Sequence, residues 1–236
     1  MSIDSRRRAL VTGGGSGIGL AIAHKLAETC DVTVLGRDKT KLVATGFPYV
    51  VADVTDPALE IGGEFDVVVN NAGIVRTAPF HKQSDADWSD MWRTNVMGAV
   101  HVTRAVLPFM RGRNWGRIVN VASTASLKGY AYVSAYTASK HALLGLTRAL
   151  AAELVATGIT VNAVCPGYTD TDIVRDAIDT IVAKTNRSED DARAGFLNPQ
   201  GRLIRPDEVA AAMAYLVSDE ARGVTGQALA IAGGEL

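Results

Sequence analysis

The chain has 236 residues, of which 47% are hydrophobic and 21% charged, the balance of an ordinary globular α/β protein. A net charge of −1 argues against a large electrostatic surface for nucleic acid, and no apolar run is long enough to predict a membrane span. Cys30 and Cys165 show neither disulfide nor zinc spacing and the four histidines form no ligand pair, so we expect a cytoplasmic protein without a metal.

Short β-branched segments alternate with longer alanine-rich segments along the chain. The segments predicted as strands are 9–13, 32–36, 49–53, 65–71, 116–123, 159–166 and 227–231. The segments predicted as helices are 17–28, 88–112, 134–156, 171–195 and 206–218, with a one-turn crossover helix between the third and fourth strands. The strands are apolar throughout, as parallel strands covered on both faces are. The pattern predicts one domain over residues 1–236, a Rossmann-type doubly wound parallel sheet of about seven strands with helices on both faces.

A glycine-rich turn, VTGGGSGIG at 11–19, follows the first strand and opens the first helix. Glycines at this place let the backbone approach a pyrophosphate and direct N–H groups at it. A tight turn that needs positive φ angles is the other interpretation of such a cluster. The spacing is T-G-x-x-x-G-x-G, formed by Thr12, Gly13, Gly17 and Gly19, and not GxGxxG.

The segment YTASK places Tyr136 and Lys140 four positions apart, on one face of a helix. A phenol, with a pKa of ~10, is rarely ionised at pH 7, and a neighbouring ammonium lowers that pKa. The pair could equally be the polar stripe of an amphipathic helix, so the rest of the chain has to decide.

Together and in this order, the motifs resemble the short-chain dehydrogenase/reductase family over nearly the whole chain. The matching motifs are the glycine turn, NNAG at 70–73, an Asn at 95, a Ser at 123, YxxxK at 136–140 and PG at 166–167. The resemblance implies that Tyr136 is the general acid/base and that Ser123 hydrogen-bonds the substrate oxygen. It implies that Lys140 tunes Tyr136 and holds the cofactor ribose, and that Asn95 positions a water in a proton relay.

The resemblance also implies a bound nicotinamide dinucleotide. The residues implied to bind it are Gly13, Gly15, Ser16, Gly17, Ile18, Gly19, Arg37, Asp53, Val54, Asn71, Ala72, Gly73, Tyr136, Lys140, Pro166, Gly167, Thr169 and Thr171. Asp172 stands where the family usually has a proline, which leaves the path of that loop open.

The end of the second strand bears on the choice of coenzyme. Arg37 stands at, or directly after, the position where NAD-dependent members carry an acid, and a guanidinium suits a 2′-phosphate. Asp38 follows it and argues the other way. The sequence favours NADP(H) over NAD(H).

Residues 168–205 follow the nicotinamide-side loop and are amphipathic, so we predict that they form a substrate lid. A surface hairpin without a substrate role is the alternative. The segment resembles bacterial members that act on 3-oxoacyl or 3-hydroxyacyl thioesters of coenzyme A or a carrier protein. Basic residues that could meet the phosphates are Lys184, Arg187, Arg193, Arg202 and Arg205. Apolar residues that could line an acyl pocket are Ile74, Leu127, Phe196 and Leu197.

Three other functions stay open. A reductase or dehydrogenase of a small ketone, sugar or cyclic alcohol would carry the same motifs. An epimerase or dehydratase of the extended relatives would need a longer C-terminal substrate domain, and a non-catalytic dinucleotide-binding regulator would not need the proton-transfer residues. Small and apolar residues on more than one side of helices 88–112 and 134–156 predict a second buried face on each. The resemblance implies that these helices pair across a twofold axis, so we expect a homotetramer or, failing that, a dimer.

Overall fold

The computed structural model describes residues 6–185 and 187–236. Its centre is a parallel sheet of seven strands in the order β3-β2-β1-β4-β5-β6-β7. The strands are Arg7–Thr12 (β1), Cys30–Gly36 (β2), Tyr49–Val51 (β3), Val67–Asn70 (β4), Gly116–Val121 (β5), Ile159–Pro166 (β6) and Ala228–Ile231 (β7). The predicted fold class is confirmed.

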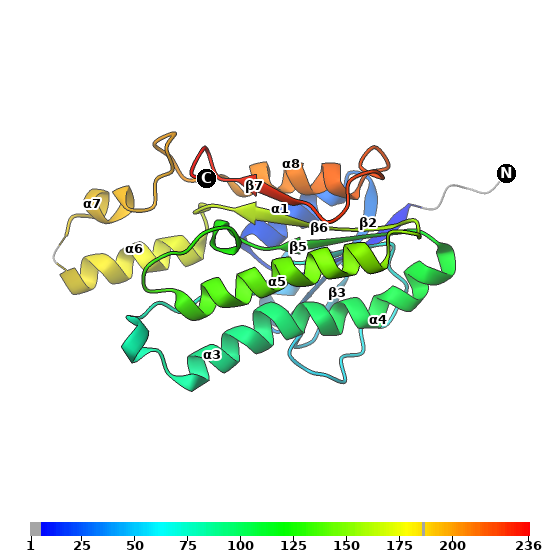
Figure 1. Ribbon diagram of the computed structural model, residues 1–236, viewed down its shortest axis with the longest axis horizontal. Helices are drawn as coiled ribbons and strands as arrows, with labels where there is room; N and C mark the ends of the chain where they lie inside the picture. Colours follow the sequence, from blue (N-terminus) through cyan, green and yellow to red (C-terminus); the bar gives the residue numbers. More distant parts are fainter. Residues whose placement is uncertain (1–5, 186) are drawn as a thin grey trace.

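Helices cover both faces of the sheet. The α-helices are Gly17–Leu26 (α1), Lys39–Ala44 (α2), Asp85–Trp92 (α3), Gly98–Arg113 (α4), Ser134–Glu153 (α5), Asp172–Thr185 (α6), Glu189–Ala194 (α7) and Pro206–Val217 (α8). Short 3-10 turns are formed by Phe80–Lys82 (η1) and Thr124–Ser126 (η3), and a π-helical turn, Arg93–Met97 (η2), joins α3 to α4. Helices α3, α4 and α5 lie on one face, and α1 and α8 on the other (Figure 1).

Two hydrophobic cores explain why the strands are apolar throughout. Successive side chains of a strand point to opposite faces, so β1 buries Ala9 and Val11 in the core beneath α1 and α8. Leu10 enters the other core, beneath α4 and α5. In β4, β5 and β6 every residue is buried. Within the described residues, no helix combines the length and hydropathy that a bilayer span requires.

The strand order reverses beside β1, which pairs with β2 on one side and β4 on the other. Ligands of open α/β sheets bind at such a reversal, beyond the carboxyl ends of the strands. Here the glycine turn follows β1, and Gly13 and Gly17 adopt positive φ angles of 63° and 53°. A Cβ on Gly19 would lie 2.3 Å from the carbonyl oxygen of Gly13, so only glycine fits there. Helices α6 and α7 lie beyond the same end of the sheet (Figure 1).

The prediction of a crossover helix between the third and fourth strands is wrong. Among the described residues, turns join β3 to β4. Asp53 accepts a hydrogen bond from the backbone N–H of Thr55, and Asp56 accepts one from Ala58, each at 2.9 Å. These local bonds give the backbone an alternative to a helix.

The predicted helix at 171–195 is two helices, and α2 had not been predicted. Ser188 starts α7, because its hydroxyl accepts the N–H of Asp191 while Asp191 accepts the hydroxyl proton. Asp38 starts α2 in the same manner, accepting the N–H of Lys41 at 3.2 Å. Asn186, inside the predicted lid, lies outside the described residues.

Candidate active site

Tyr136 and Lys140 face the same space next to the end of β5. Tyr136 is the third residue of α5, and Lys140 follows one turn later. The ammonium of Lys140 is buried, donates a hydrogen bond to the carbonyl oxygen of Val121 at 2.8 Å, and lies 5.7 Å from the centre of the Tyr136 ring. An ammonium has three N–H donors, so Lys140 can also bind a ligand hydroxyl.

Burial shifts the pKa of both groups towards the uncharged form in the free protein. Burial raises the pKa of Tyr136, interaction with the Ser123 hydroxyl lowers it, and Tyr168 and Cys165 raise it further. Burial lowers the pKa of Lys140 to about 8, and the Cys165 thiol opposes that shift. A positively charged group bound beside the phenol would therefore be needed to favour the phenolate.

Asn95 occupies the π-helical turn between α3 and α4, an irregularity often found at functional sites. Its side-chain oxygen accepts the N–H of Ile74 at 2.8 Å, and its amide donates to the Ile74 carbonyl and to the Ser139 hydroxyl, each at 3.0 Å. A Cβ on Gly73 would lie 3.2 Å from the Asn95 oxygen and 3.6 Å from the Lys140 ammonium nitrogen. Asn95 thus joins the segment after β4 to the helix that carries Tyr136.

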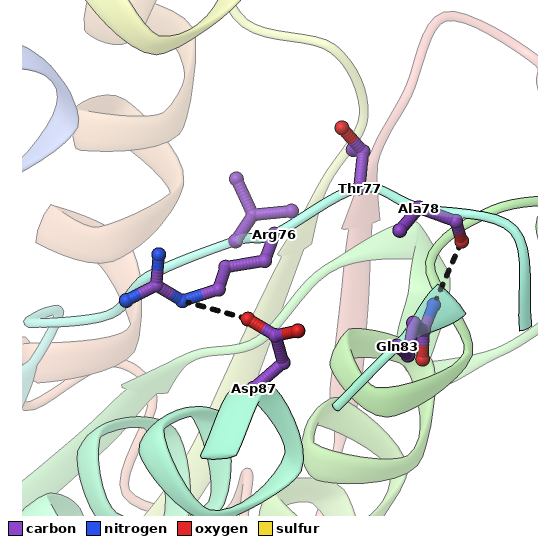
Figure 2. A pocket seen from close by; sticks show the side chains of 6 residues that line it. Arg76, Thr77, Ala78, Gln83 and Asp87 are labelled. Atoms are coloured by element: carbon purple, nitrogen blue, oxygen red, sulfur yellow. Dashed lines mark hydrogen bonds and ion pairs between the residues drawn. The ribbon is translucent and has the colours of Figure 1, made fainter. Parts of the chain in front are cut away.

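Gln83 fixes the start of α5. Its side-chain oxygen accepts the N–H of Ala135, one of the first-turn donors that have no partner inside a helix. Its amide donates to the carbonyl of Ala78 at 3.0 Å (Figure 2). The hollow of about 370 Å³ in that view is lined by residues 75–78, Gln83 and Asp87, and its cation, Arg76, is neutralised by Asp87 and Asp90. We therefore assign the hollow no catalytic part.

The glycine turn is locked to the segment after β4 by Asn71. Its amide donates to the carbonyls of Thr12 and Gly13 at 2.9 and 3.2 Å. The Thr12 hydroxyl accepts the backbone N–H groups of Asn71 and Ala72, both at 3.0 Å. Ser16, Gly17, Ile18 and Gly19 follow as the start of α1, where free backbone N–H groups suit an anion.

The loop after β6 reaches the same turn. A Cβ on Gly17 would lie 3.4 Å from the Thr171 methyl group. Thr171 donates to the carbonyl of Thr169, and Thr169 to that of Gly167, so both buried hydroxyls brace the loop that begins at Pro166. The loop leads into α6, where Asp172 pairs with Arg175 at 2.6 Å.

Residues after β2 and β3 lie beside the glycine turn on its other side. The side chain of Arg37 is 71% exposed and lies 3.6 Å from Asp53, and the Val54 carbonyl contacts His101. A Cβ on Gly15 would lie 3.2 Å from the Cβ of Lys41. The structure therefore gathers the sequence-predicted cofactor residues along one edge of the sheet, and the fit to a dinucleotide is good: a glycine cradle, a buried ammonium and a cationic corner.

Comparison with known proteins agrees with this geometry. The signature described as short chain dehydrogenase matches residues 7–181. The chain belongs to the short-chain dehydrogenase/reductase family. It is an oxidoreductase that acts between carbonyl and CH–OH groups.

Relatives of this chain match it over nearly their whole length. Acetoacetyl-CoA reductase of Shinella zoogloeoides is 38% identical, over 97% of this chain and 98% of the relative. D-beta-hydroxybutyrate dehydrogenase of Cupriavidus necator is 35% identical, over 93% of this chain and 94% of the relative. Among solved structures, a variant of actinorhodin polyketide ketoreductase with NADPH gives a TM-score of 0.92 at 38% identity, covering 98% of this chain and 97% of that one. Levodione reductase gives a TM-score of 0.91 at 32% identity, covering 98% of this chain and 98% of that one.

Sequence reasoning missed three residues that shape this dehydrogenase site. Gln83 and Ser139 act through hydrogen bonds to the start of α5 and to Asn95, and neither bond has a motif in the sequence. Lys41 could have been noticed, because it lies one helical turn after Asp38 in a segment with a helix-capping signal.

Replacing Tyr136 with Phe removes the phenol and leaves the ring. We expect kcat/KM for carbonyl reduction to fall by at least about 10²-fold, because proton transfer by a positioned acid contributes that much. Coenzyme affinity, measured by fluorescence titration, should stay within about twofold. Tyr215→Phe, on the exposed face of α8, is the matched control and should keep full activity. Near-normal turnover in Tyr136→Phe would remove the phenol from the mechanism.

Replacing Lys140 with Met should stabilise the free protein while abolishing most activity. At pH 7 the buried ammonium costs folding free energy, and an apolar side chain of similar length should raise the free energy of unfolding by about 1–3 kcal/mol. The folded-state pKa of about 8 lies below the unfolded value, so the wild type gains stability as pH rises from 8 towards 10. Between pH 8 and pH 10 the difference in free energy of unfolding between the variant and wild type should therefore shrink, by at most ~1.4 kcal/mol per pH unit.

Urea unfolding of the free protein at pH 7 and pH 9.5 measures this difference. Lys25→Met, at an exposed lysine of α1, is the control and should show no such pH-dependent gain. A Lys140→Met protein less stable than wild type at pH 7 would contradict the assigned burial penalty.

Proposed function

We propose that this chain reduces 3-oxoacyl thioesters to 3-hydroxyacyl thioesters, with NADPH as the coenzyme. The observation that carries the proposal is that Tyr136, Lys140 and Asn95 lie at one sheet edge beside a dinucleotide cradle. The Ser123 hydroxyl interacts with the Tyr136 phenol there. The full-length relative named acetoacetyl-CoA reductase supports the thioester class. The relative named for D-beta-hydroxybutyrate supports the 3-oxo/3-hydroxy pattern alone, because its name contains no thioester. A reductase of plain ketones or sugars is the alternative, and one similar solved structure is named levodione reductase rather than for a thioester.

Each residue has a defined part in the proposed reaction. When bound, NADPH supplies the hydride to the carbonyl carbon. Tyr136 gives its phenolic proton to the developing alkoxide, and the Ser123 hydroxyl donates a hydrogen bond to the same oxygen. Lys140 holds the ribose and favours the phenolate left behind. Asn95 would position a water from which Lys140 passes a proton back to Tyr136.

Three side chains near the end of β2 support the proposed preference for NADPH. Arg37 is free to meet a 2′-phosphate, since its contact with Asp53 is long at 3.6 Å and exposed. Asp38, which would disfavour a phosphate, is engaged in capping α2. Lys41 runs beside Gly15 and adds a second cation.

Arg37→Glu should lower kcat/KM for NADPH by at least about tenfold and change that for NADH far less, because a carboxylate repels the 2′-phosphate. Steady-state kinetics with both coenzymes measure the ratio. Arg76→Glu, at an exposed arginine already paired with acids, is the charge-matched control. A wild type that prefers NADH would refute the coenzyme assignment.

The proposed lid, residues 168–205, brings an aromatic contact and a cation to the substrate side. Phe196 packs edge-on against Tyr168 with ring centres 4.8 Å apart. We assign this aromatic pair to the acyl chain of the substrate. Leu197 and Arg193 line a hollow of about 510 Å³ at the base of α8. Arg202 and Arg205 pair with Glu208 and Asp207, so Arg193 is a better candidate than either for a phosphate of coenzyme A or phosphopantetheine.

We propose a homotetramer in the cytoplasm. The exposed face of α5 carries Gly145, Ala149 and Ala152, whose small side chains allow close approach of a second copy. Cys30 and Cys165 are free buried thiols, as suits a reducing compartment. Light scattering at micromolar concentration should give four times the mass of the chain, and a monomer would contradict the proposed assembly.

The test of the thioester assignment is the change in absorbance at 340 nm on mixing enzyme and NADPH with candidate carbonyls. Acetoacetyl-CoA should be reduced with a kcat/KM of about 10⁴ M⁻¹s⁻¹ or more, the ordinary range of enzymes. Plain ketones and sugars should be at least about tenfold poorer, because they lack the pantetheine contacts. Activity on ketones or sugars with none on the thioester would refute this substrate class.

A further inference from the structure

Glu235 is a carboxylate outside the reacting set that contacts two loops of the active site. It follows β7, and its side chain is only 15% exposed. One oxygen contacts the hydroxyl of Tyr130 and lies 3.2 Å from the Lys128 ammonium, which also bonds the Glu235 carbonyl at 3.0 Å. The other oxygen would lie 2.9 Å from a Cβ placed on Gly167. Its bonded partners thus come from the loop after Ser123, and its second oxygen lies against the loop after β6.

Chemistry fixes the direction of the hydrogen bonds in this cluster. A carboxylate can only accept, so the Tyr130 phenol donates to Glu235. The phenol has one proton, so the Thr124 hydroxyl, 2.7 Å away, must donate to Tyr130. Burial and Glu235 both raise the pKa of Tyr130, which keeps that proton on the phenol. An ordered chain therefore runs from Thr124, the neighbour of Ser123, through Tyr130 to Glu235.

An aromatic contact extends the cluster to the proposed lid. The Tyr130 ring packs edge-on against Tyr168 with centres 6.3 Å apart, and Tyr168 packs against Phe196. Tyr168 is adjacent to Gly167, and its phenol is also one of the groups that raise the pKa of Tyr136. Glu235 is thus in contact with the two loops whose relative placement decides where a substrate oxygen meets Ser123.

We propose that Glu235 is a positioning residue for the substrate. By holding Tyr130 and Lys128 against the Gly167–Tyr168 backbone, it fixes the loop that begins at Ser123 relative to the base of the lid. Asn95, Lys140 and the start of α5 are held by separate contacts, so the proton-transfer pair keeps its geometry without Glu235. The proposal rests on the carbonyl reductase function and does not depend on the thioester assignment.

The kinetic test compares Glu235→Ala and Glu235→Gln with wild type. For whichever carbonyl the wild type reduces, Glu235→Ala should raise KM about tenfold and lower kcat less than about threefold, because loosened loops bind the substrate more weakly while the acid stays in place. Glu235→Gln keeps an oxygen that accepts from Tyr130 and should recover most of the loss. Glu64→Gln, at an exposed glutamate paired with Arg8 far from the site, is the control.

A measurement without substrate tests the role of Glu235 independently of the proposed function. Hydrogen–deuterium exchange followed by mass spectrometry should show faster exchange in Glu235→Ala across residues 122–133 and 166–172, and unchanged exchange in α1 and α4. Tyr130→Phe should reproduce the KM effect, and the double variant should be no worse than either single one, since both break the same chain.

Three outcomes would overturn the proposal: an unchanged KM in Glu235→Ala, unchanged exchange in the two loops, or a double variant whose losses simply add. Inactivity of the wild type towards acetoacetyl-CoA would refute the thioester assignment alone. The exchange experiment and the kinetics with another carbonyl would still test Glu235.

Discussion

The ammonium of Lys140 is buried against the end of β5, held by the Val121 carbonyl at 2.8 Å and close to the ring of Tyr136. Burial lowers the pKa of this lysine to about 8 and at the same time raises the pKa of Tyr136. A charge in such a place destabilises the free protein and is most useful when a ligand shares its hydrogen bonds. The other contacts of the site hold this lysine and the neighbouring phenol in fixed positions relative to each other.

Three sets of contacts hold α5, the helix that carries both residues. Deep in the fold, the Asn70 amide donates to Asn120, and the Asn120 amide donates to Thr147 of α5, both at 2.8 Å. Near the reacting groups, Asn95 bonds Ser139, and at its first turn the helix is capped by Gln83. Because these bonds are mostly buried, they lie in a low dielectric, where satisfied polar groups fix one geometry. Rigid placement of Tyr136 and Lys140 therefore comes from β4, β5 and the π-helical turn together.

Much of this arrangement could be predicted from the sequence, and the failures have physical causes. The uniformly apolar strands and the glycine turn predicted the doubly wound sheet, and the structure gathers the predicted site residues at its carboxyl edge. Short elements were lost, because Asp53 and Asp56 divert the backbone after β3 into turns while Asp38 starts a six-residue helix. Gln83 and Glu235 were missed, because their partners lie 52 and 105 residues away and leave no periodic signal.

The central claim is that a buried, uncharged phenol becomes an effective acid/base only when coenzyme and Lys140 act on it together. The direct measurement is an NMR titration of protein labelled with ¹³C at the tyrosine ring, with the Tyr136 signal assigned from Tyr136→Phe. The pKa of Tyr136 should lie above its ordinary value in the free protein and fall by at least about one unit when NADP⁺ binds, the effect of a nearby positive charge. In Lys140→Met the fall should be smaller. An unchanged Tyr136 pKa on binding NADP⁺, or the same fall without the lysine, would contradict the account.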